Sequence, residues 1–423
     1  MNHKHAVYLL IFIALGVVLG FAAGLTYGED MMAIKWVGDL FLDALKMMII
    51  PLIIAAVISG VTSLGDVRKL GRIGSMTIAY YLVTTGIAVF IGLVVVNIFQ
   101  PGVGIDLVVL DDHGDKINRV SERAEGGFIT IIESLVTQNL FAAAADMKVL
   151  PLIVFSIAFG AALTTIPKVG DQVITFFNGV NEAMMKLVVW LMYFAPIGIF
   201  ALVAARLGLA ESQGGFWNQV TAIGMHVVTV LTGLGLHFVV LMLILFFIAG
   251  RGWPYLLNLA RALLTAFGTA SSSATLPITM ESAREAGIDD RAARFVIPLG
   301  STVNMNGTAL YEACAAMFIA QAYGIHLGME GQIIVFITAT LAAIGAAGIP
   351  EAGLVTMVIV LNAAGLPTEG IALLLTVDWF LDRFRTSVNV WGDAVGAAVV
   401  DRHLPDIGID TGEEDGLNKE GIV

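Results

Sequence analysis

Long apolar segments follow one another along almost the whole chain. The first covers residues 6–28, and about 20 predominantly apolar residues are enough for a helix to cross a bilayer. Only 13% of the 423 residues are charged, whereas soluble globular proteins carry about 25%. The sequence therefore predicts an all-α integral membrane protein without a nucleic-acid-binding surface. Further spans are expected at 36–64, 74–99, 149–166, 173–207 and 221–249; the 173–207 span is long enough to require tilt or an extension along the membrane surface.

The charges between these segments predict the orientation of the chain. The loop 66–72 is the clearest short basic loop, whereas residues 28–32 are acidic. By the positive-inside rule, the N-terminus and the 66–72 loop are cytoplasmic and the polar segment 101–127 is extracytoplasmic. The run 6–28 exceeds the roughly 7–15 residues of a signal-peptide core, so we expect a transmembrane helix there. The short loops favour a prokaryotic plasma membrane, with both termini in the cytoplasm.

Two later apolar segments, 256–278 and 333–361, are interrupted near their middle by small residues. The first contains the run Ser271–Ser273 and ends its loop at Pro277, and the second contains a Gly/Ala loop that ends at Pro350. Interrupted segments in corresponding positions are typical of transporter binding sites, because non-helical backbone inside a membrane survives only where it is buried or lines a cavity. We expect two re-entrant hairpins related as inverted repeats, each followed by a helix broken around an Asn.

The segment 376–400 places charged residues inside an otherwise apolar helix, where each costs a few kcal/mol on insertion scales. Asp382 and Arg385 are three residues apart and therefore share one helical face. A cation beside a carboxylate suits a zwitterionic, acidic small molecule. The alternative is a purely structural ion pair between these two residues. The polar residues of this segment are Asp378, Asp382, Arg383, Arg385, Asn389 and Asp393.

Several motifs resemble those of the dicarboxylate/amino acid:cation symporter family, which includes archaeal aspartate transporters and mammalian excitatory amino acid transporters. The resemblance runs nearly end to end, from L-K-M-M-I-I-P-L at 45–52 and Y-Y-L-V-T-T at 80–85 to the last apolar helix. The strongest motifs are S-S-S-A-T-L-P at 271–277, N-M-N-G-T-A-L-Y-E at 304–312, G-A-A-G-I-P-E-A-G at 345–353 and D-R-F-R-T-S-V-N-V-W-G-D at 382–393.

The resemblance implies a homotrimer in which each subunit has eight transmembrane helices and two re-entrant hairpins. A transport domain then moves across the membrane like an elevator against a static scaffold, with the second hairpin as gate. The implied parts are scaffold helices 1–2 at 1–73, transport-domain helix 3 at 74–100, an extracytoplasmic loop with the start of helix 4 at 101–148, scaffold helices 4–5 at 149–210, the rest of the transport domain at 211–400 and an acidic cytoplasmic tail at 401–423.

The family's substrate residues match positions in this chain. The resemblance implies that Ser272 and Asn389 hold the main carboxylate, that Asp382 binds the amino group, and that Arg385 clamps the side-chain carboxylate with its planar fork. Thr308 and Thr386 would supply flanking hydroxyls. The remaining implied contacts are at the tip of the first hairpin, Ala270 and Ser271, at Met305, and along the gate, Ile349, Pro350, Glu351, Ala352 and Gly353; for the charge of Glu351 we have no mechanistic account.

Arg385 and Asp382 decide the implied substrate class. Family members that carry neutral amino acids lack an arginine at the position of Arg385. The C4-dicarboxylate branch lacks an aspartate at the position of Asp382. We therefore expect L-aspartate or L-glutamate, with C4-dicarboxylates as the alternative within the same fold. Neither residue ranks aspartate against glutamate.

A reading from another functional class is an intramembrane serine hydrolase that uses the run 271–273 with His226 or His237. Such an enzyme needs a serine–histidine hydrogen bond and an oxyanion hole. Three serines in a row are poor evidence for one activated nucleophile, and the paired hairpins stay unexplained. We expect a transporter rather than an enzyme, without an organic cofactor, and two histidines that hydrogen-bond a neighbouring helix.

The resemblance also implies sodium sites, one of which is altered in this chain. The third site normally contains an aspartate, where this chain has Asn306. The third sodium is then weakened or absent, or the amide oxygen still coordinates it with lower affinity. The implied ligands are Gly300, Asn304, Asn389 and Asp393 at site 1, Thr302, Met305, Ala343, Ile344 and Ala346 at site 2, and Tyr81, Thr84, Thr85, Asn304 and Asn306 at site 3.

Glu312 implies coupling to protons. It stands where proton-coupled, potassium-countertransporting mammalian members have glutamate and archaeal sodium-only members have glutamine. Burial disfavours the charged form of a carboxyl, which suits a group that takes up and releases a proton in each cycle. The alternative is a permanently neutral, hydrogen-bonded glutamic acid. An arginine that archaeal members carry before the serine run is Ala270 here, and Arg383 supplies that charge from the last helix, as in mammalian members.

Overall fold

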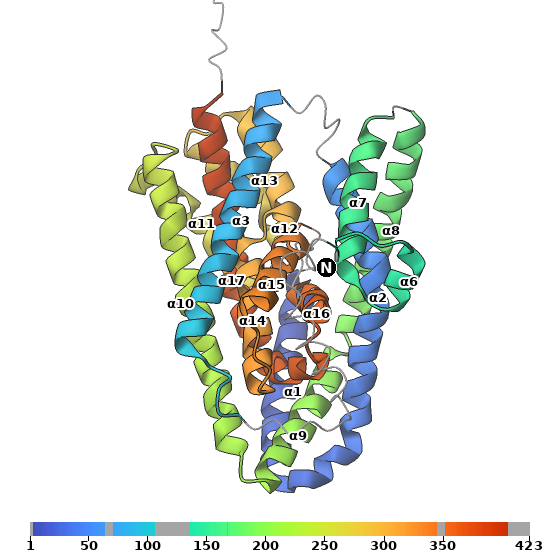
Figure 1. Cartoon of the computed structure of the whole chain (residues 1–423). Coiled ribbons are helices and arrows are strands. Elements are labelled where there is room, and N and C mark those ends of the chain that lie inside the picture. The colour runs from blue at the N-terminus through green and yellow to red at the C-terminus, as the bar shows by residue number, and fades with distance from the viewer. Residues whose placement is uncertain are drawn as a thin grey trace, which may run out of the picture.

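The computed structural model describes residues 3–63, 71–105, 133, 135–166, 168–344 and 352–404, and the regular elements in these ranges are all helices (Figure 1). Residues 66–70 of the predicted basic loop 66–72 and residues 106–127 of the 101–127 segment lie outside the described residues, whereas Arg72 belongs to the helix Gly71–Phe99. Four described segments are long and apolar enough to cross a membrane: Ile11–Met48, Ile73–Phe99, Ala195–Ser212 and Phe216–Phe247. The predicted helical, multi-span class is confirmed.

The first helix, α1 (His3–Tyr27), packs along α9 (Ala195–Ser212) at very short range. Glycines at 16, 20 and 24 form a stripe of small residues with a spacing of four, and a Cβ at Gly16 would lie 2.5 Å from the Pro196 carbonyl oxygen. Close backbone approach through such stripes is a common way for helices to pack in membranes, where the apolar effect between helices is weak.

The next elements form one side of the molecule. A 3₁₀ turn, η1 (Gly28–Ile34), leads into α2 (Lys35–Thr62), which contacts both α7 (Val149–Thr164) and α8 (Val169–Met192) (Figure 1). A short helix, α6 (Leu140–Ala145), precedes α7. These helices leave many large apolar side chains exposed, as expected for surfaces that face lipid or another subunit.

The single long span predicted at 173–207 is wrong. The structure has two helices there, because α8 ends at Met192 and α9 begins at Ala195 with Pro196 in its first turn. Proline lacks an N–H and its ring clashes with the carbonyl of the preceding turn, so the earlier helix ends before it while the new helix accepts it at its start.

The most buried part of the molecule surrounds α14 (Asn306–Ala322), in which every residue except Gln321 is buried. The helices α3 (Gly71–Phe99), α10 (Phe216–Phe247) and α17 (Ile371–Arg402) pack against it. This position explains why α14 has no exposed polar face: even its polar residues Asn306, Thr308 and Glu312 are buried.

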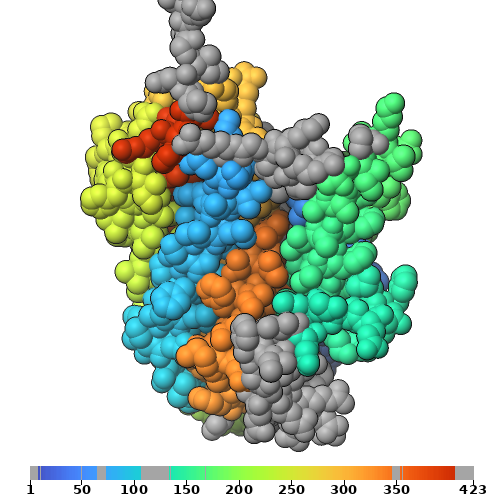
Figure 2. Space-filling view, turned by 45° about the horizontal axis from the view of Figure 1, so that its top comes forward, coloured from blue at the N-terminus to red at the C-terminus, as the bar shows by residue number. Residues whose placement is uncertain are grey.

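Two helical hairpins stand where the apolar pattern is interrupted. In the first, α11 (Trp253–Thr269) turns back into α12 (Ser272–Glu285) through Ala270, which adopts a left-handed conformation with φ +48°. In the second, α15 (Met329–Ala342) packs against α16 (Ala352–Ala363), and residues 345–351 between them lie outside the described part. Figure 2 shows the residues of the second hairpin at the surface between α3 and α7.

The two helices that follow the hairpins differ from each other. After the first hairpin, α13 (Asp290–Val303) and α14 are separate helices that meet at Asn304 and Met305, as predicted. After the second, a short turn η2 (Thr368–Gly370) leads into α17. This helix is 32 residues long and continues through Asn389 without a break. The predicted break at Asn389 is wrong, because this side chain bonds to α14 and does not compete with its own helix for backbone groups.

Candidate functional site

The polar face of α17 is turned into the protein. Arg385 is 0% exposed, and its Nη2 lies 2.9 Å from Asp382 Oδ1 and 3.0 Å from Asp378 Oδ1. Asn389 and Asp393 are buried on the same helix. One arginine thus serves two aspartates in an environment that water does not reach, where charges interact more strongly than at a surface.

The guanidinium of Arg385 also packs against an aromatic ring, and one of its nitrogens has no partner in the described part of the chain. Its Cζ lies 4.0 Å from the centre of the Tyr311 ring on α14, which is a cation–π distance. Its Nη1 has no hydrogen-bond partner among the described residues. A Cβ at Gly353 would lie 2.7 Å from this Nη1, so a larger residue at the start of α16 would displace the Arg385 side chain. Arg385 therefore presents an unused N–H group toward the first turn of the second hairpin's return helix.

Sequence reasoning counted Asp378 among the polar residues of the 376–400 segment but gave it no individual role, and it gave none to Tyr311. Asp378 precedes Arg385 by seven residues, which is two helical turns, so the spacing places both on one face. That spacing was a usable signal. Tyr311 offered none, because its contact with Arg385 joins two helices far apart in the sequence.

The tip of the first hairpin is tied to its neighbours by hydrogen bonds. Ser271 caps α12 by accepting from the Ala274 N–H at 3.2 Å, and the Ser272 hydroxyl donates to the Ser301 carbonyl of α13 at 3.0 Å. Arg383 of α17 donates from Nη1 to the carbonyl oxygens of residues 267 and 268 at 2.9 and 3.1 Å. The tip is therefore held between α13 and α17, with Arg383 satisfying carbonyls that the end of α11 leaves free.

Asn389 joins α17 to the start of α14. Its Oδ1 accepts from the Gly307 N–H at 2.7 Å, and its Nδ2 donates to the Thr308 hydroxyl at 3.2 Å. Thr386, three residues before Asn389, and Met305, two residues before Gly307, are also buried. Ala270 is buried at the tip of the first hairpin. The structure thus gathers the predicted substrate residues of α12, α14, α16 and α17, whereas Ile349, Pro350 and Glu351 lie outside the described residues and only the backbone of Ala352 is described.

A second polar cluster surrounds Asp393. This carboxylate is 2% exposed, and its Oδ1 accepts from Asn304 Nδ2 at 3.0 Å. It lies directly against Gly300 of α13, because a Cβ at Gly300 would collide with its oxygen. A buried carboxylate with an amide donor is still poorly compensated as an anion. The cluster therefore suits a cation bound by carboxylate and backbone oxygens.

The neighbouring cluster at α3 fits a cation less well. Thr85 donates its hydroxyl to Asn306 Oδ1 at 2.7 Å, and Thr84 donates to the Tyr80 carbonyl at 2.8 Å. The Nδ2 group of Asn306 is buried without an acceptor among the described residues. An amide brings a donor as well as an acceptor into the cluster, and it brings no negative charge. Tyr81 and Asn304 border the same region, and Thr84 lies 3.4 Å from Asn304 Oδ1.

The residues predicted for sodium site 2 are only partly placed. Met305 and Ala343 are buried, Ile344 is half-buried, and Thr302 is exposed. Ala346 lies outside the described residues. This ligand set stays a prediction.

Glu312 of α14 is 0% exposed and lies near Thr356 of α16 and Arg385. The two histidines of α10, His226 and His237, are also fully buried, and neither ring nitrogen has a hydrogen-bond partner among the described residues. The expectation that they bond a neighbouring helix is therefore wrong; His226 instead packs its ring 4.8 Å from that of Phe318. In the described part of the chain, no hydrogen bond joins a serine of the 271–273 run to either histidine.

Comparison with known proteins places this architecture in a family. A family model described as the sodium:dicarboxylate symporter family matches residues 9–403. The excitatory amino acid transporter 1 of Ambystoma tigrinum is 38% identical over 94% of this chain and 82% of its own. The excitatory amino acid transporter 4 of Mus musculus is 40% identical over 87% and 77%, and the excitatory amino acid transporter 3 of Homo sapiens is 37% identical over 93% and 85%. The chain belongs to the sodium:dicarboxylate symporter family and is a multi-pass, cation-coupled membrane symporter, not an enzyme.

Proposed function

We propose that this symporter takes up acidic amino acids, L-aspartate or L-glutamate. The observation that carries the proposal is the buried group of Asp378, Asp382 and Arg385, with the free Nη1 of Arg385 facing the start of α16. An acidic amino acid carries two carboxylates and one ammonium, so it needs a cation, an anion and further N–H donors. Relatives named as excitatory amino acid transporters support the same class.

Each charged group of the substrate has a partner in this proposal. Arg385 binds the side-chain carboxylate through a fork of N–H groups, which matches carboxylate geometry. Asp382 leaves the Arg385 guanidinium and binds the substrate ammonium. Asp378 remains paired with Arg385 and compensates its charge. Ser272 at the tip of the first hairpin and Asn389 of α17 bind the main carboxylate. Residues 349–353 close over the substrate as the gate.

We assign the coupling ions to the two clusters and to Glu312. Sodium binds at Asp393 with Gly300, Asn304 and Asn389, because carboxylate and carbonyl oxygens are hard ligands suited to Na⁺. A second sodium binds near Met305 and the end of α15. The Asn306 cluster contributes little sodium affinity, because the amide has no charge. Protons are carried by Glu312, because its burial disfavours the charged carboxylate.

The proposed movement is an elevator within a homotrimer of the plasma membrane, with both termini cytoplasmic. The scaffold unit comprises α1, α2 and α7–α9, and the transport unit comprises α3 and α10–α17. This division keeps the substrate residues on α12, α14, α16 and α17 in one unit. The C4-dicarboxylate alternative has no use for Asp382, whose carboxylate would repel a substrate without an amine.

The test is uptake of radiolabelled L-aspartate into proteoliposomes, with Na⁺ and pH gradients imposed separately. We expect uptake driven by inward Na⁺ and increased by an inward H⁺ gradient, with competition by L-glutamate and not by succinate. Uptake of succinate without aspartate supports the dicarboxylate alternative and refutes the role of Asp382. Uptake driven by H⁺ alone refutes the sodium assignments and leaves Glu312 as the coupling group.

A further inference from the structure

Three buried tyrosines contact the helices that form the Asp393 cluster, and the proposed function uses none of their hydroxyls. Tyr80 and Tyr81 are neighbours on α3, and Tyr255 lies in the first turn of α11. They are 8%, 2% and 3% exposed. A buried tyrosine hydroxyl usually finds a hydrogen-bond partner, so the partners of these three hydroxyls show what each side chain holds in place.

Two of the hydroxyls hold the backbone of α17 on either side of Asp393. Tyr80 donates its hydroxyl hydrogen to the Gly392 carbonyl at 2.8 Å. Tyr255 donates to the Ala394 carbonyl at 2.7 Å. Because the two tyrosines come from different helices, α3 and α11, their hydrogen bonds fix the rotation of α17 about its own axis at this point. The direction in which the Asp393 carboxylate leaves α17 is therefore fixed as well.

The third hydroxyl holds the facing turn of α13. Tyr81 donates to the Val296 carbonyl at 2.5 Å. In a regular helix this carbonyl accepts from the N–H of the residue four positions later, which is Gly300. A Cβ at Gly300 would lie 3.0 Å from the Tyr81 hydroxyl oxygen. The hydroxyl thus lies against the helical turn that leads to Gly300, one of the predicted sodium ligands, and ties this turn to α3.

Two glycines inside helices make room for this arrangement. A Cβ at Gly396 of α17 would lie 2.6 Å from Cε1 of the Tyr80 ring. Gly300 of α13 likewise leaves space for both the Asp393 carboxylate and the Tyr81 hydroxyl. Glycine in the interior of a helix is unfavourable relative to alanine. The close contacts with the two tyrosines give a physical reason for glycine at both positions.

We propose that Tyr80, Tyr81 and Tyr255 form a tyrosine frame, a set of positioning residues for the sodium site at Asp393. The frame holds the Asp393 carboxylate and the Gly300 backbone at the separation that suits Na⁺. This inference rests on the sodium assignment made under the proposed function. Hydrogen-bond partners behind the ligands of a metal site orient those ligands and change its metal affinity. Ligands that are held from α3 and α11 cannot move inward around the smaller Li⁺, so the frame also determines which cation is bound.

The test measures Na⁺ binding to the purified full-length protein without any amino acid. An ion that binds the folded state raises the melting temperature in a concentration-dependent way, so thermal scans over a range of NaCl concentrations, with choline chloride keeping the ionic strength constant, give the Kd for Na⁺. We expect Tyr80→Phe, Tyr81→Phe and Tyr255→Phe each to raise this Kd by about tenfold. The ratio of the Kd for Li⁺ to the Kd for Na⁺ should fall, because loosened ligands can approach the smaller ion. A purely structural tyrosine would lower the melting temperature in choline chloride alone and leave this ratio unchanged.

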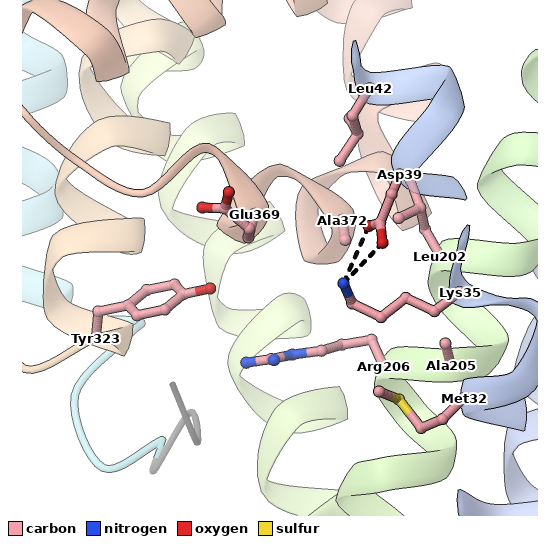
Figure 3. A pocket seen from close by; sticks show the side chains of 10 residues that line it. All are labelled: Met32, Lys35, Asp39, Leu42, Leu202, Ala205, Arg206, Tyr323, Glu369 and Ala372. Carbon is pink, nitrogen blue, oxygen red and sulfur yellow. Dashed lines mark hydrogen bonds and ion pairs between the residues drawn. The ribbon is translucent and has the colours of Figure 1, made fainter. Parts of the chain in front are cut away.

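Tyr323→Phe is the matched control, because it removes the same hydroxyl far from the Asp393 cluster. Tyr323 follows the last residue of α14 and lines a different cavity, together with Lys35, Asp39 and Arg206 (Figure 3). The 17 residues of α14, which span about 25 Å, separate Tyr323 from the start of that helix. The Kd for Na⁺ in this control should stay within about two-fold of its original value.

The outcomes separate the tyrosine frame from the sodium assignment. Asp393→Asn should remove most of the Na⁺-dependent rise in melting temperature; a full rise in this variant would overturn the sodium assignment and the frame with it. A rise that is lost in Asp393→Asn, with an unchanged Kd and an unchanged Li⁺/Na⁺ ratio in the folded frame variants, would overturn the frame alone. An equal change in Tyr323→Phe would also overturn it. If one frame variant fails to fold, the other two test the same prediction.

Discussion

Replacing Arg385 with lysine tests the proposed substrate site most directly. Lysine keeps one positive charge but replaces a planar group of several N–H donors by a single nitrogen. In the structure, one nitrogen of Arg385 already serves both Asp378 and Asp382, and the free Nη1 faces Gly353. The lysine ammonium holds its three N–H groups on one nitrogen, so it lacks the separate second nitrogen that faces Gly353 while Nη2 serves both aspartates. We therefore expect Arg385→Lys to lose substrate affinity while the fold is kept.

The size of the loss follows from the burial of the group. Arg385 is 0% exposed, so water does not replace the missing bond. A hydrogen bond to a charged group contributes about 1.5–3 kcal/mol, which corresponds to a roughly 10- to 150-fold rise in KM for L-aspartate. Because the lysine charge remains beside the two aspartates, the additional cost of leaving a buried carboxylate without any cation is avoided.

The assay is the concentration dependence of L-aspartate uptake into proteoliposomes at saturating Na⁺. The matched control is Arg383→Lys, two residues away, because the hydrogen bonds of Arg383 within the described ranges go to backbone carbonyls that a lysine can also reach. We expect KM in the control to stay within about two-fold of its original value. A folded Arg385→Lys protein with unchanged KM, or an equal rise in the control, would refute the assignment of Arg385 as the carboxylate clamp.

Three further predictions address the cations, the proton and stability. Asn306→Asp places a carboxylate beside Thr85, so the Na⁺ concentration for half-maximal uptake should fall by about tenfold (about 1.4 kcal/mol) and the Hill coefficient for Na⁺ should rise; unchanged values count against a cation cluster at this position. Glu312→Gln removes the only titratable group that we assign to proton coupling, so uptake should lose its response to an inward H⁺ gradient while Na⁺-driven uptake continues, and a retained response in vesicle assays contradicts the assignment. Asp289 caps α13, and the side-chain hydrogen bond from Arg291 lowers the pKa of Asp289 to about 2. The contribution of the Asp289 carboxylate to stability is therefore present above its ordinary pKa near 4 and is lost as pH falls through about 2. Asp289→Ala should lower the melting temperature by about 1–3 °C at pH 7 in a thermal scan. An unchanged melting temperature rules out a stabilising cap.

The helical class and the positions of the interruptions were predictable from local sequence. Apolar length alone predicts membrane helices, and the Ser271–Ser273 run correctly marks the turn of the first hairpin. Boundaries that depend on one proline were less accessible. The 173–207 segment has a continuous apolar pattern, and only the start of a new helix at Ala195, just before Pro196, divides it.

Whether Asn389 breaks its helix illustrates a limit of pattern reasoning. In sequence, Asn389 resembles Asn304, because both stand between apolar residues in a polar motif of an apolar segment. In the structure, Asn304 lies at the junction of α13 and α14, whereas Asn389 sits in a continuous helix and bonds to the backbone of Gly307. The difference is set by the neighbouring helix that offers Asn389 a partner, and this neighbour is more than 80 residues away.

The sequence by itself determined the membrane class, the two interrupted segments and the polar face of the last helix, because apolar length and helical spacing are local properties. Only the tertiary structure decided that Asp378 shares Arg385 with Asp382 and that Tyr311 covers the guanidinium. The contact with Tyr311 joins helices distant in the chain. Helical spacing predicts that Asp378 shares a face with Arg385, but the direction in which that face points depends on how α17 packs. Such contacts follow from how whole helices pack, which no short window of residues contains.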